Sequence, residues 1–328
     1  MAPLPPAVRR QGPVLVVGDA NLDLVLTGDV VPRFGQVEQL LDAADLTLGG
    51  SASIVAAGLG ALGTEVSLVA RIGDDLFGRL TLEALVRRGV HVAGIGTDPE
   101  LPSALTVILS APGDRAILTL PGAIPQVRGD DVTDEMLARC AHVHVASYFL
   151  LPGLAAGLPD LFARARSAGC TTSLDTNWDP AEAWAGVLDV LPLVDVLLPN
   201  TAELRAVSDL LPAGAGAGDV AARATALARL GPLVVVKDGA AGGLAATADG
   251  VLHAPAGVTD VVDTTGAGDS FDAGFLAAWA DGHPVESCLR WAVAAGSLST
   301  RALGGTPGQA TRGEVAALVA GTAGSGPT

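Results

Sequence analysis

The sequence predicts an α/β fold in which a mainly parallel sheet is covered by helices on both faces. Short apolar runs rich in Val, Leu and Ile alternate along the chain with segments whose apolar residues recur at the helical period. This alternation is typical of parallel strands joined by helical connections. Residues 20–48 and 96–128 depart from it, because they are richer in Pro and Gly and hold short alternating stretches. We expect them to form a small antiparallel sheet attached to the main one.

The elements can be placed in order along a single domain, residues 1–328. The last residues, 321–328, are small and polar and are expected to be disordered. The expected buried strands are 14–18, 142–146, 171–175, 194–199 and 232–239, and the expected helices are 51–62, 78–89, 157–168, 201–210, 219–230 and 270–281.

The charge balance excludes several kinds of partner. The chain has 19 basic and 35 acidic residues and a net charge of -16, so its field would repel nucleic acid and anionic lipid. We therefore expect neither nucleic acid nor a membrane as a partner. The three cysteines are scattered, and the first residues lack the apolar core of a signal peptide. Both features predict a cytoplasmic protein.

Two patterns that resemble known sites have simpler explanations. Gly58 to Gly63 match the GxGxxG dinucleotide pattern, but they end a predicted helix and precede a strand, which is the reverse of the order that such a site needs. Cys140, His142 and His144 lie on one face of a predicted strand. Same-face neighbours on a strand are roughly 6.5 Å apart, and three in a line cannot meet at one metal ion.

Lys237 is the one lysine of the chain. It is followed by Asp238 rather than by Ser or Thr, which excludes a Walker P-loop. Contact with a phosphate group and a solvated position at a strand end both stay open as roles for this residue.

The tetrapeptide Gly-Ala-Gly-Asp occurs twice, and its surroundings separate the copies. Residues 216–219 lie in a Gly/Ala loop between two predicted helices, so Asp219 is expected to cap the second helix. Residues 266–269 follow an extended segment, 257–265, and open a predicted helix. Glycines there let backbone N–H groups turn to one point, and the helix dipole adds positive potential, which together make an anion hole.

Asp269, in the first turn of that helix, could accept a proton from a nearby hydroxyl group. An anion hole and a base are what phosphoryl transfer to an alcohol requires. An ordinary capped helix would be a serious rival explanation if this junction stood alone.

Further segments accompany this junction along the chain. They are VLVVGDANLDLVL (14–26), LGGSASIVAAGLGALG (48–63), VSLVARIGDDLFG (66–78), DTNWDP (175–180), LLPNTAEL (197–204), VVVKDGAAGGL (234–244) and DTTGAGDSF (263–271). Together, in this order, they resemble the ribokinase-like (PfkB) family of carbohydrate kinases over nearly the whole chain. The resemblance implies a three-layer α/β/α sandwich with a small β-sheet lid from residues 20–48 and 96–128. It also implies ATP and Mg²⁺, and K⁺ in those members of the family that use a monovalent cation.

The resemblance assigns roles at the phosphate end of the site. Asp269 matches the catalytic base, and Gly266, Ala267 and Gly268 match the anion hole. Asn200 and Glu203 match a pair that organises Mg²⁺ and phosphate through water. The same two residues would form a capping box in any protein, and both roles can hold.

It also assigns residues around the substrates. Lys237 and Gly239 match the strand end beside the nucleotide phosphates. The remaining matches are Asn21 and Asp23 for the sugar hydroxyls, Gly49 and Gly50 for close backbone approach at the same pocket, and Asp263, Thr265 and the loop 300–306 for the monovalent cation.

The chain departs from the family at two places. Ile54 stands where the family usually has Asn, so one sugar-binding amide is lost. Trp178 and Asp179 stand where kinases of acidic sugars tend to have Arg, so we expect a neutral sugar.

Two other functions stay open. A nucleoside kinase on the same scaffold could stack a base on Phe34, Tyr148 or Phe149. A non-catalytic sugar sensor is the second, although it would be expected to have lost at least one of the catalytic residues. Closure of the lid would exclude water, and its exposed face leaves open a homodimer.

Overall fold

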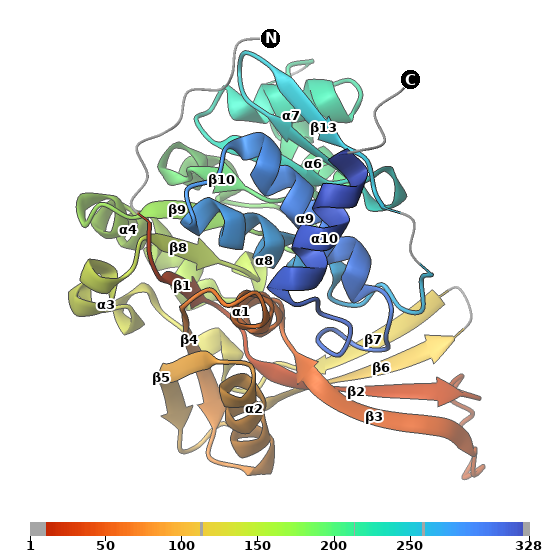
Figure 1. Ribbon diagram of the computed structural model, residues 1–328. Helices are drawn as coiled ribbons and strands as arrows, with labels where there is room; N and C mark the ends of the chain where they lie inside the picture. Colours follow the sequence, from red (N-terminus) through yellow and green to blue (C-terminus); the bar gives the residue numbers. More distant parts are fainter. Residues whose placement is uncertain (1–10, 112–113, 213, 258–259, 324–328) are drawn as a thin grey trace.

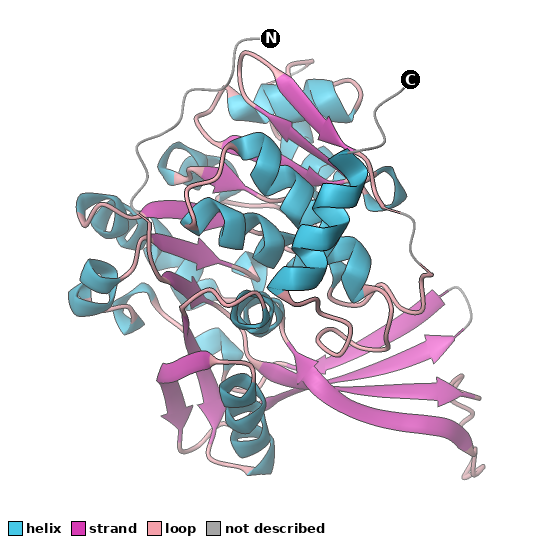
Figure 2. Ribbon diagram, in the orientation of Figure 1, coloured by secondary structure: helices cyan, strands magenta, loops and turns pink. Residues whose placement is uncertain are grey.

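The apolar runs form a central sheet of nine strands with helices on both sides (Figures 1 and 2). The computed structural model describes residues 11–323 apart from 112–113, 213 and 258–259. The strand order is β13-β12-β11-β10-β9-β8-β1-β4-β5, and all neighbours are parallel except the two pairs that β12 makes. The strands are β1 (Val14–Val17), β4 (Val66–Gly73), β5 (Val90–Asp98), β8 (His142–Val145), β9 (Thr171–Leu174), β10 (Val196–Leu197), β11 (Leu233–Lys237), β12 (Gly243–Ala246) and β13 (Val251–Ala254).

The two faces of this sheet bury separate apolar clusters, because successive strand residues point to opposite faces. Val14 and Val16 belong to one cluster, and Leu15 and Val17 to the other. The first face is covered by α1 (Ser51–Ala61), α2 (Leu76–Arg87), α8 (Ala267–Ala280), α9 (Val285–Ser299) and α10 (Arg312–Ala323). The second is covered by α3 (Asp134–Arg139), α4 (Pro152–Ser167), α5 (Val187–Val190), α6 (Thr201–Asp209) and α7 (Val220–Ala228).

A separate sheet of four strands projects from this body, at the lower right of Figure 1. Its order is β3-β2-β6-β7, and it comes from the two ranges that the sequence singled out. The prediction that it is antiparallel was wrong at its centre, since β2 and β6 are parallel. The reason is that β2 and β6 continue from β1 and β5, which run in the same direction in the main sheet. The strands are β2 (Asn21–Gly28), β3 (Leu41–Gly49), β6 (Ala104–Ala111) and β7 (Asp114–Leu120).

The predicted strands and helices are present, with shifted ends. The helix expected at 157–168 begins earlier, at Pro152. The strands β12 and β13 were not predicted, because four-residue strands such as Gly-Leu-Ala-Ala carry little β-branched signal. The segment expected to be extended before α8 forms no strand in its described part; instead Val262 and Asp263 N–H groups donate to the Thr300 carbonyl. The tail expected to be disordered overlaps α10, which continues to Ala323, and residues 324–328 lie outside the described ranges.

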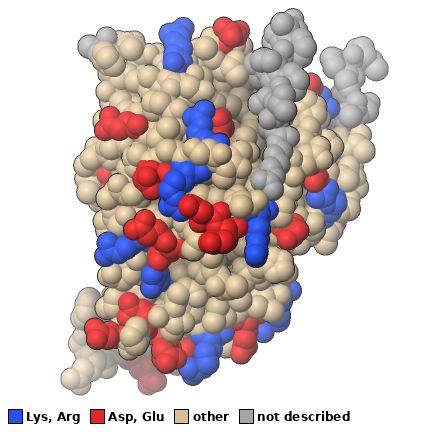
Figure 3. Space-filling view, turned by 90° about the vertical axis from the view of Figure 1, so that its left-hand side faces the viewer, with Lys and Arg blue, Asp and Glu red and all other residues tan. Residues whose placement is uncertain are grey.

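The surface adds two observations. On the face drawn in Figure 3, basic side chains lie among acidic ones rather than in a patch of one sign. Within the described ranges, no helix has the length and apolar character that crossing a membrane requires.

Candidate active site

The two Gly-Ala-Gly-Asp copies differ in the fold as predicted. Asp219 is the N-cap of α7, and its side chain accepts a 2.8 Å hydrogen bond from the N–H of Ala222. Gly266 is the N-cap of α8 with φ of 69°, and Asp269 lies in the first turn of that helix. A side chain at position 266 would collide with the backbone of Gly305, so glycine is required there by space as well as by φ.

Asp269 belongs to a polar network at the start of two helices. The Ser51 hydroxyl, at the N-terminus of α1, donates to Asp269 Oδ1, and Asn177 Nδ2 donates to Ser51 Oγ at 3.1 Å. Burial raises the pKa of Asp269 to about 7, against the lowering effect of the Ser51 hydrogen bond. A carboxyl group with a pKa near neutrality is suited to accept a proton.

Lys237 lies beside two acids that the sequence did not single out. Its Nζ is 2.6 Å from Asp175 Oδ2 and 3.1 Å from Asp272 Oδ2, so the ammonium group is held by two buried carboxyl groups. Its aliphatic chain lies near Gly268, where an added Cβ would be 3.4 Å from Lys237 Cδ. The residue therefore lies beside the anion hole but is not a solvated strand end.

Asn200 and Glu203 form the capping box at the start of α6. Asn200 Oδ1 accepts from the N–H groups of Ala202 and Glu203, both at 2.9 Å, and Glu203 Oε2 accepts from the N–H of Asn200 at 2.8 Å. Burial raises the pKa of Glu203 to about 7, and the charge of Asp175 adds to the effect. Asn200 pairs with Lys237 in an isolated bridge, so α6 begins next to the end of β11.

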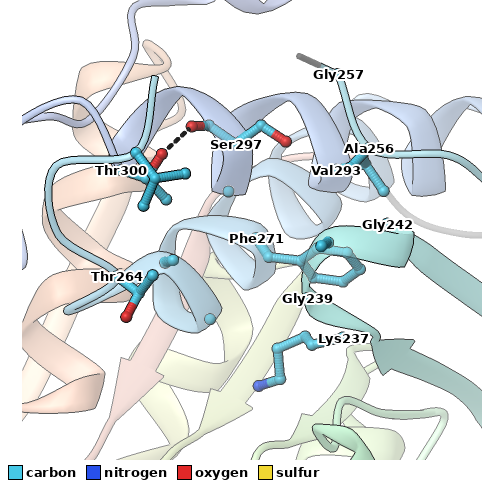
Figure 4. Close-up of a pocket in the computed structure, with 15 residues that line it drawn as sticks. Lys237, Gly239, Gly242, Ala256, Gly257, Thr264, Phe271, Val293, Ser297 and Thr300 are labelled. Carbon is cyan, nitrogen blue, oxygen red and sulfur yellow. Dashed lines mark hydrogen bonds between the residues drawn. The ribbon is translucent and has the colours of Figure 1, made fainter. Parts of the chain in front are cut away.

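A cavity of about 420 Å³ runs along α8 from this edge of the sheet (Figure 4). Four of the residues that line it are ones that the sequence analysis expected near ATP or in the anion hole: Lys237, Gly239, Ala267 and Gly268. Its other walls are largely apolar or small, and they include Gly242, Ala256, Val261, Phe271, Val293 and Gly296.

The predicted sugar residues lie together on the small sheet. Asn21 Nδ2 donates to Asp23 Oδ1 at 2.8 Å, and both side chains are buried. Burial raises the pKa of Asp23 to about 6. The two glycines lie against these residues: a Cβ on Gly49 would overlap the Asp23 carboxylate, and one on Gly50 would lie 2.6 Å from Asn21 Oδ1. They make room for these two side chains.

Asp263 and Thr265 lie in the loop before α8. Asp263 Oδ1 accepts from the N–H and the hydroxyl of Thr265 at 3.0 and 2.9 Å, and Oδ2 accepts from the N–H of Gly304 at 2.8 Å. Arg115, on β7, donates to Thr265 Oγ1 at 2.8 Å and lies 4.0 Å from Asp263 Oδ1. A protein cation from the small sheet thus reaches the site expected for a monovalent cation.

Of the three residues that depart from the family pattern, Ile54 and Asp179 support the fold, and Trp178 is partly exposed. Ile54 is buried, and its side chain contacts Gly305. The Asp179 carboxylate accepts from the N–H groups of Ala181, Ala183 and Trp184 at 2.9, 2.8 and 2.7 Å, so it holds a turn. The side chain of Trp178 is 48% exposed.

The two simpler explanations agree with the structure. α1 runs into Gly63 before β4 begins, and Gly60 allows α1 to pass close to the Arg88 carbonyl. His142 and His144 bond to the hydroxyl groups of Thr171 and Ser173, and no metal-binding group of His, Cys, Asp or Glu occurs in the described part of the chain.

Several residues of the site were missed in the sequence, and some carry a signal. Asp175 directly follows a buried strand and Asp19 comes two residues after one, at the edge where sites of parallel sheets lie. Asp19 accepts from the N–H groups of Ser51 and Ala52 at the start of α1, and Asp272 lies three residues after Asp269 on α8. Ser51 and Asn177 carry no comparable signal in a single sequence.

A glycine turn at a helix N-terminus, a carboxyl group whose pKa is raised to about 7 beside it and a cavity along the same helix are an arrangement that suits phosphoryl transfer to an alcohol. A model of the pfkB family of carbohydrate kinases matches residues 12–312, and the chain belongs to this family. Members such as ribokinase and fructokinase are phosphotransferases.

The chain is similar to several characterised members. It is 31% identical to an ATP-dependent ribose-1-phosphate kinase of Halopiger xanaduensis, covering 87% of this chain and 91% of that protein. It is 28% identical to a ribokinase of Bacillus subtilis, and the match covers 93% of this chain and 99% of that protein. The structure of Arabidopsis thaliana ribokinase with ribose and ATP superposes with a TM-score of 0.79 at 26% identity, covering 94% of this chain and 99% of that one.

Proposed function

We propose that this protein transfers the γ-phosphate of ATP to a hydroxyl group of a small neutral sugar. The observation that carries the proposal is the place of Asp269, a carboxyl group with a pKa of about 7 beside the Gly266–Gly268 turn. Asp269 would accept the proton of the acceptor hydroxyl while the N–H groups stabilise charge on the transferred phosphate. The hydroxyl of Ser51 already makes with Asp269 the contact that an acceptor hydroxyl would make.

The cavity along α8 would hold the nucleotide. Its apolar walls suit the adenosine part, and it leads to Gly268 at the helix N-terminus, where the phosphates would lie. Asn200 and Glu203 would hold Mg²⁺ through water, and a bound Mg²⁺ would neutralise phosphate charge. We propose that a monovalent cation at Asp263 and Thr265 stimulates the enzyme only weakly, because Arg115 already brings positive charge there. Turnover measured in KCl and in tetramethylammonium chloride compares the enzyme with and without a cation small enough for this site.

Asn21 and Asp23 would bind the sugar hydroxyls under the small sheet, which acts as the lid. Two buried polar groups that hydrogen-bond each other can exchange that bond for bonds to a substrate hydroxyl. A sugar phosphate is a second candidate acceptor, because Arg115 reaches the site from the lid. The positive charge of Arg115 also acts to lower the pKa of Asp23, against the larger effect of burial.

Two of the three aromatic residues that a nucleoside kinase could use to stack a base are packed in the protein. Tyr148 is buried, and Phe149 packs edge-on against Tyr148 and Trp184 at centroid distances of 4.9 and 5.3 Å. Phe34 is 97% exposed. The sensor hypothesis is opposed by the presence of Asp269, Asn200 and Glu203.

An ADP-release screen with Mg²⁺ tests these functions together. Pentoses, hexoses, nucleosides and ribose 1-phosphate are each supplied at the same concentration, and a neutral sugar is expected to give the highest rate. Sugar binding without ADP release above the hydrolysis rate would favour the sensor.

The proposal includes a cytoplasmic homodimer joined through the lid. Exposed apolar side chains gather on the small sheet, among them Leu46, Ile117, Leu118 and Leu120. The three cysteines form no disulfide, which supports a reducing compartment. Light scattering of the full chain and of the Ile117→Lys variant tests the dimer.

A further inference from the structure

A second cavity, of about 300 Å³, lies on the other side of the small sheet from the sugar residues. Leu22 and Leu48, which are paired across β2 and β3, form its floor. Their neighbours Asn21 and Asp23 point to the opposite face, because side chains alternate along a strand. The rest of the wall comes from α2 and from the loop at Thr306. This cavity is therefore distinct from the pocket expected for the sugar, although Thr306 belongs to the loop expected to hold the monovalent cation.

The polar wall of this cavity carries two arginines. Arg88 is partly buried, and its guanidinium donates to the Thr306 carbonyl at 2.7 Å and contacts Gln309 Oε1 at 3.5 Å. Within the described residues no carboxylate lies within 4.0 Å of it, and burial lowers its pKa. Arg87 adds a second cation, and its 3.7 Å contact with Glu83 is an exposed ion pair of little strength.

A partly buried cation that has only neutral oxygens as partners favours an anion beside it. A guanidinium has five N–H donors in a planar fork, which suits two-point binding of a carboxylate or phosphate. The apolar lining, with Leu22, Leu46 and Leu80, suits an apolar part of the same ligand. A volume of about 300 Å³ is at the small end of ligand pockets, which limits the ligand to a small molecule.

The loop that Arg88 holds is part of the catalytic end of the molecule. Gln309 Nε2 donates to the Ile54 carbonyl of α1 at 2.8 Å and to Ser270 Oγ, next to Asp269, at 3.4 Å. Gly305 lies against Gly266 at the anion hole. A ligand that changes the Arg88 contacts would therefore shift a loop that packs on both helix N-termini of the site.

We propose that this cavity is an effector site for a small organic anion, a carboxylate or phosphate ester with an apolar part, held by Arg87 and Arg88. Binding does not depend on the proposed kinase function, whereas its effect on rate does.

Calorimetry of the full chain with n-butyl phosphate and with butyrate as probes tests the binding, since the two share an apolar chain and differ in the anionic group. We expect one of them to bind, Arg88→Gln to raise its Kd by about tenfold to a hundredfold, the loss of one charge-assisted hydrogen bond, and Arg87→Gln to raise it by about twofold to fivefold, since its side chain is exposed. Arg79→Gln, on the same helix but outside the cavity wall, is the control and should bind as wild type. Since Arg88 supports a loop, its variant could fail to fold; Arg87, with a side chain 69% exposed, then decides the question.

The rate of ADP release with and without the bound probe tests the effector role. A change in kcat that requires a higher probe concentration in Arg87→Gln supports it. Failure of both probes to bind the wild-type chain, or binding that neither arginine substitution weakens, overturns the site. Binding without any change in rate overturns the regulatory role, and a chain with no kinase activity leaves the calorimetric result standing.

Discussion

The ammonium group of Lys237 lies 2.6 Å from the carboxylate of Asp175, and this buried ion pair lies beside the anion hole. A third group, Asp272, is 3.1 Å from the same nitrogen and fully buried. Two buried carboxylates beside one ammonium group would leave an unbalanced negative charge, so we expect one of the two acids to keep its proton. Burial raises the pKa of Asp272 well above its usual value. Burial would also raise that of Asp175, but Lys237 and hydrogen bonds lower it below the usual value.

We therefore expect the two acids to respond unequally to the same substitution. Asp272→Asn replaces a neutral acid by a neutral amide and should change the free energy of unfolding by about 1 kcal/mol or less. Asp175→Asn removes the ionised partner of Lys237 and obliges the buried Asp272 to give up its proton in its place, so it should cost more than Asp272→Asn, up to about 3–5 kcal/mol if Asp272 stays neutral. Urea unfolding at pH 7 measures both, and equal losses would show that the proton is not on Asp272.

Substrate preference follows from the polar residues of the acceptor site. Asn21 and Asp23 are an amide and an acid, and Trp178 and Asp179 add no cation near them, so neutral sugars should be phosphorylated with a higher kcat/KM than sugar acids. The comparison is made with ADP release over both classes of sugar. A keto-acid sugar that surpasses every neutral sugar would contradict this expectation and would point to Arg115 as its partner.

Glu203→Gln should raise the Mg²⁺ concentration needed for half-maximal activity. The amide oxygen can still accept from the N–H of Asn200, so α6 stays capped, and the KM for the sugar should stay near wild type because the residues proposed to bind the sugar lie on β2. Asp219→Asn is the control, since Asp219 accepts from the N–H of Ala222 at the start of α7 and no site role is assigned to it. If sugar binding is lost and the Mg²⁺ requirement is not, the pair acts only as a capping box.

Much of the fold could be predicted because its signals are local. The strands of the main sheet are continuous apolar runs, and Asp219 and Asp269 could be placed at the starts of α7 and α8 from the helical pattern that follows each, although the strand expected before Asp269 is not formed. The parallel pairing of β2 with β6 could not, since it depends on the direction in which β1 and β5 already run. The same holds for the site: the contact of Ser51 with Asp269 joins residues 218 positions apart, and no period or spacing reports it.

The pH dependence of kcat/KM should have an acid limb near pH 7. Asp269 must be ionised to accept a proton, and because its pKa is raised to about 7, activity should fall as the pH drops below that value. Glu203, with a pKa also raised to about 7, would make the fall steeper. Ser51→Ala separates the two, because the Ser51 hydroxyl lowers the pKa of Asp269. The limb should move to higher pH in that variant, and an unmoved limb would assign it to another group.

Asp269→Asn should lower kcat by a factor of about 10² to 10⁴, the usual contribution of a positioned general base. The amide keeps the size of the side chain and can still bond to Ser51, so the loss would come from chemistry rather than from the fold. Asp219→Asn is the matched control from the other Gly-Ala-Gly-Asp copy. Asn caps helices about as well as Asp, so its turnover should stay near wild type.

The thermal midpoint of Asp269→Asn gives an independent check on the same carboxyl group. Its pKa is 3.8 when unperturbed and about 7 in the folded chain, so the folded state binds the proton more tightly. Its contribution to stability is then complete below pH 3.8 and is lost as the pH rises through 7. Relative to wild type, the Asn variant should therefore gain in Tm between pH 5 and pH 8. Retained activity in Asp269→Asn, lost activity in Asp219→Asn, or a Tm difference that does not change with pH would each show that Asp269 is not the buried base.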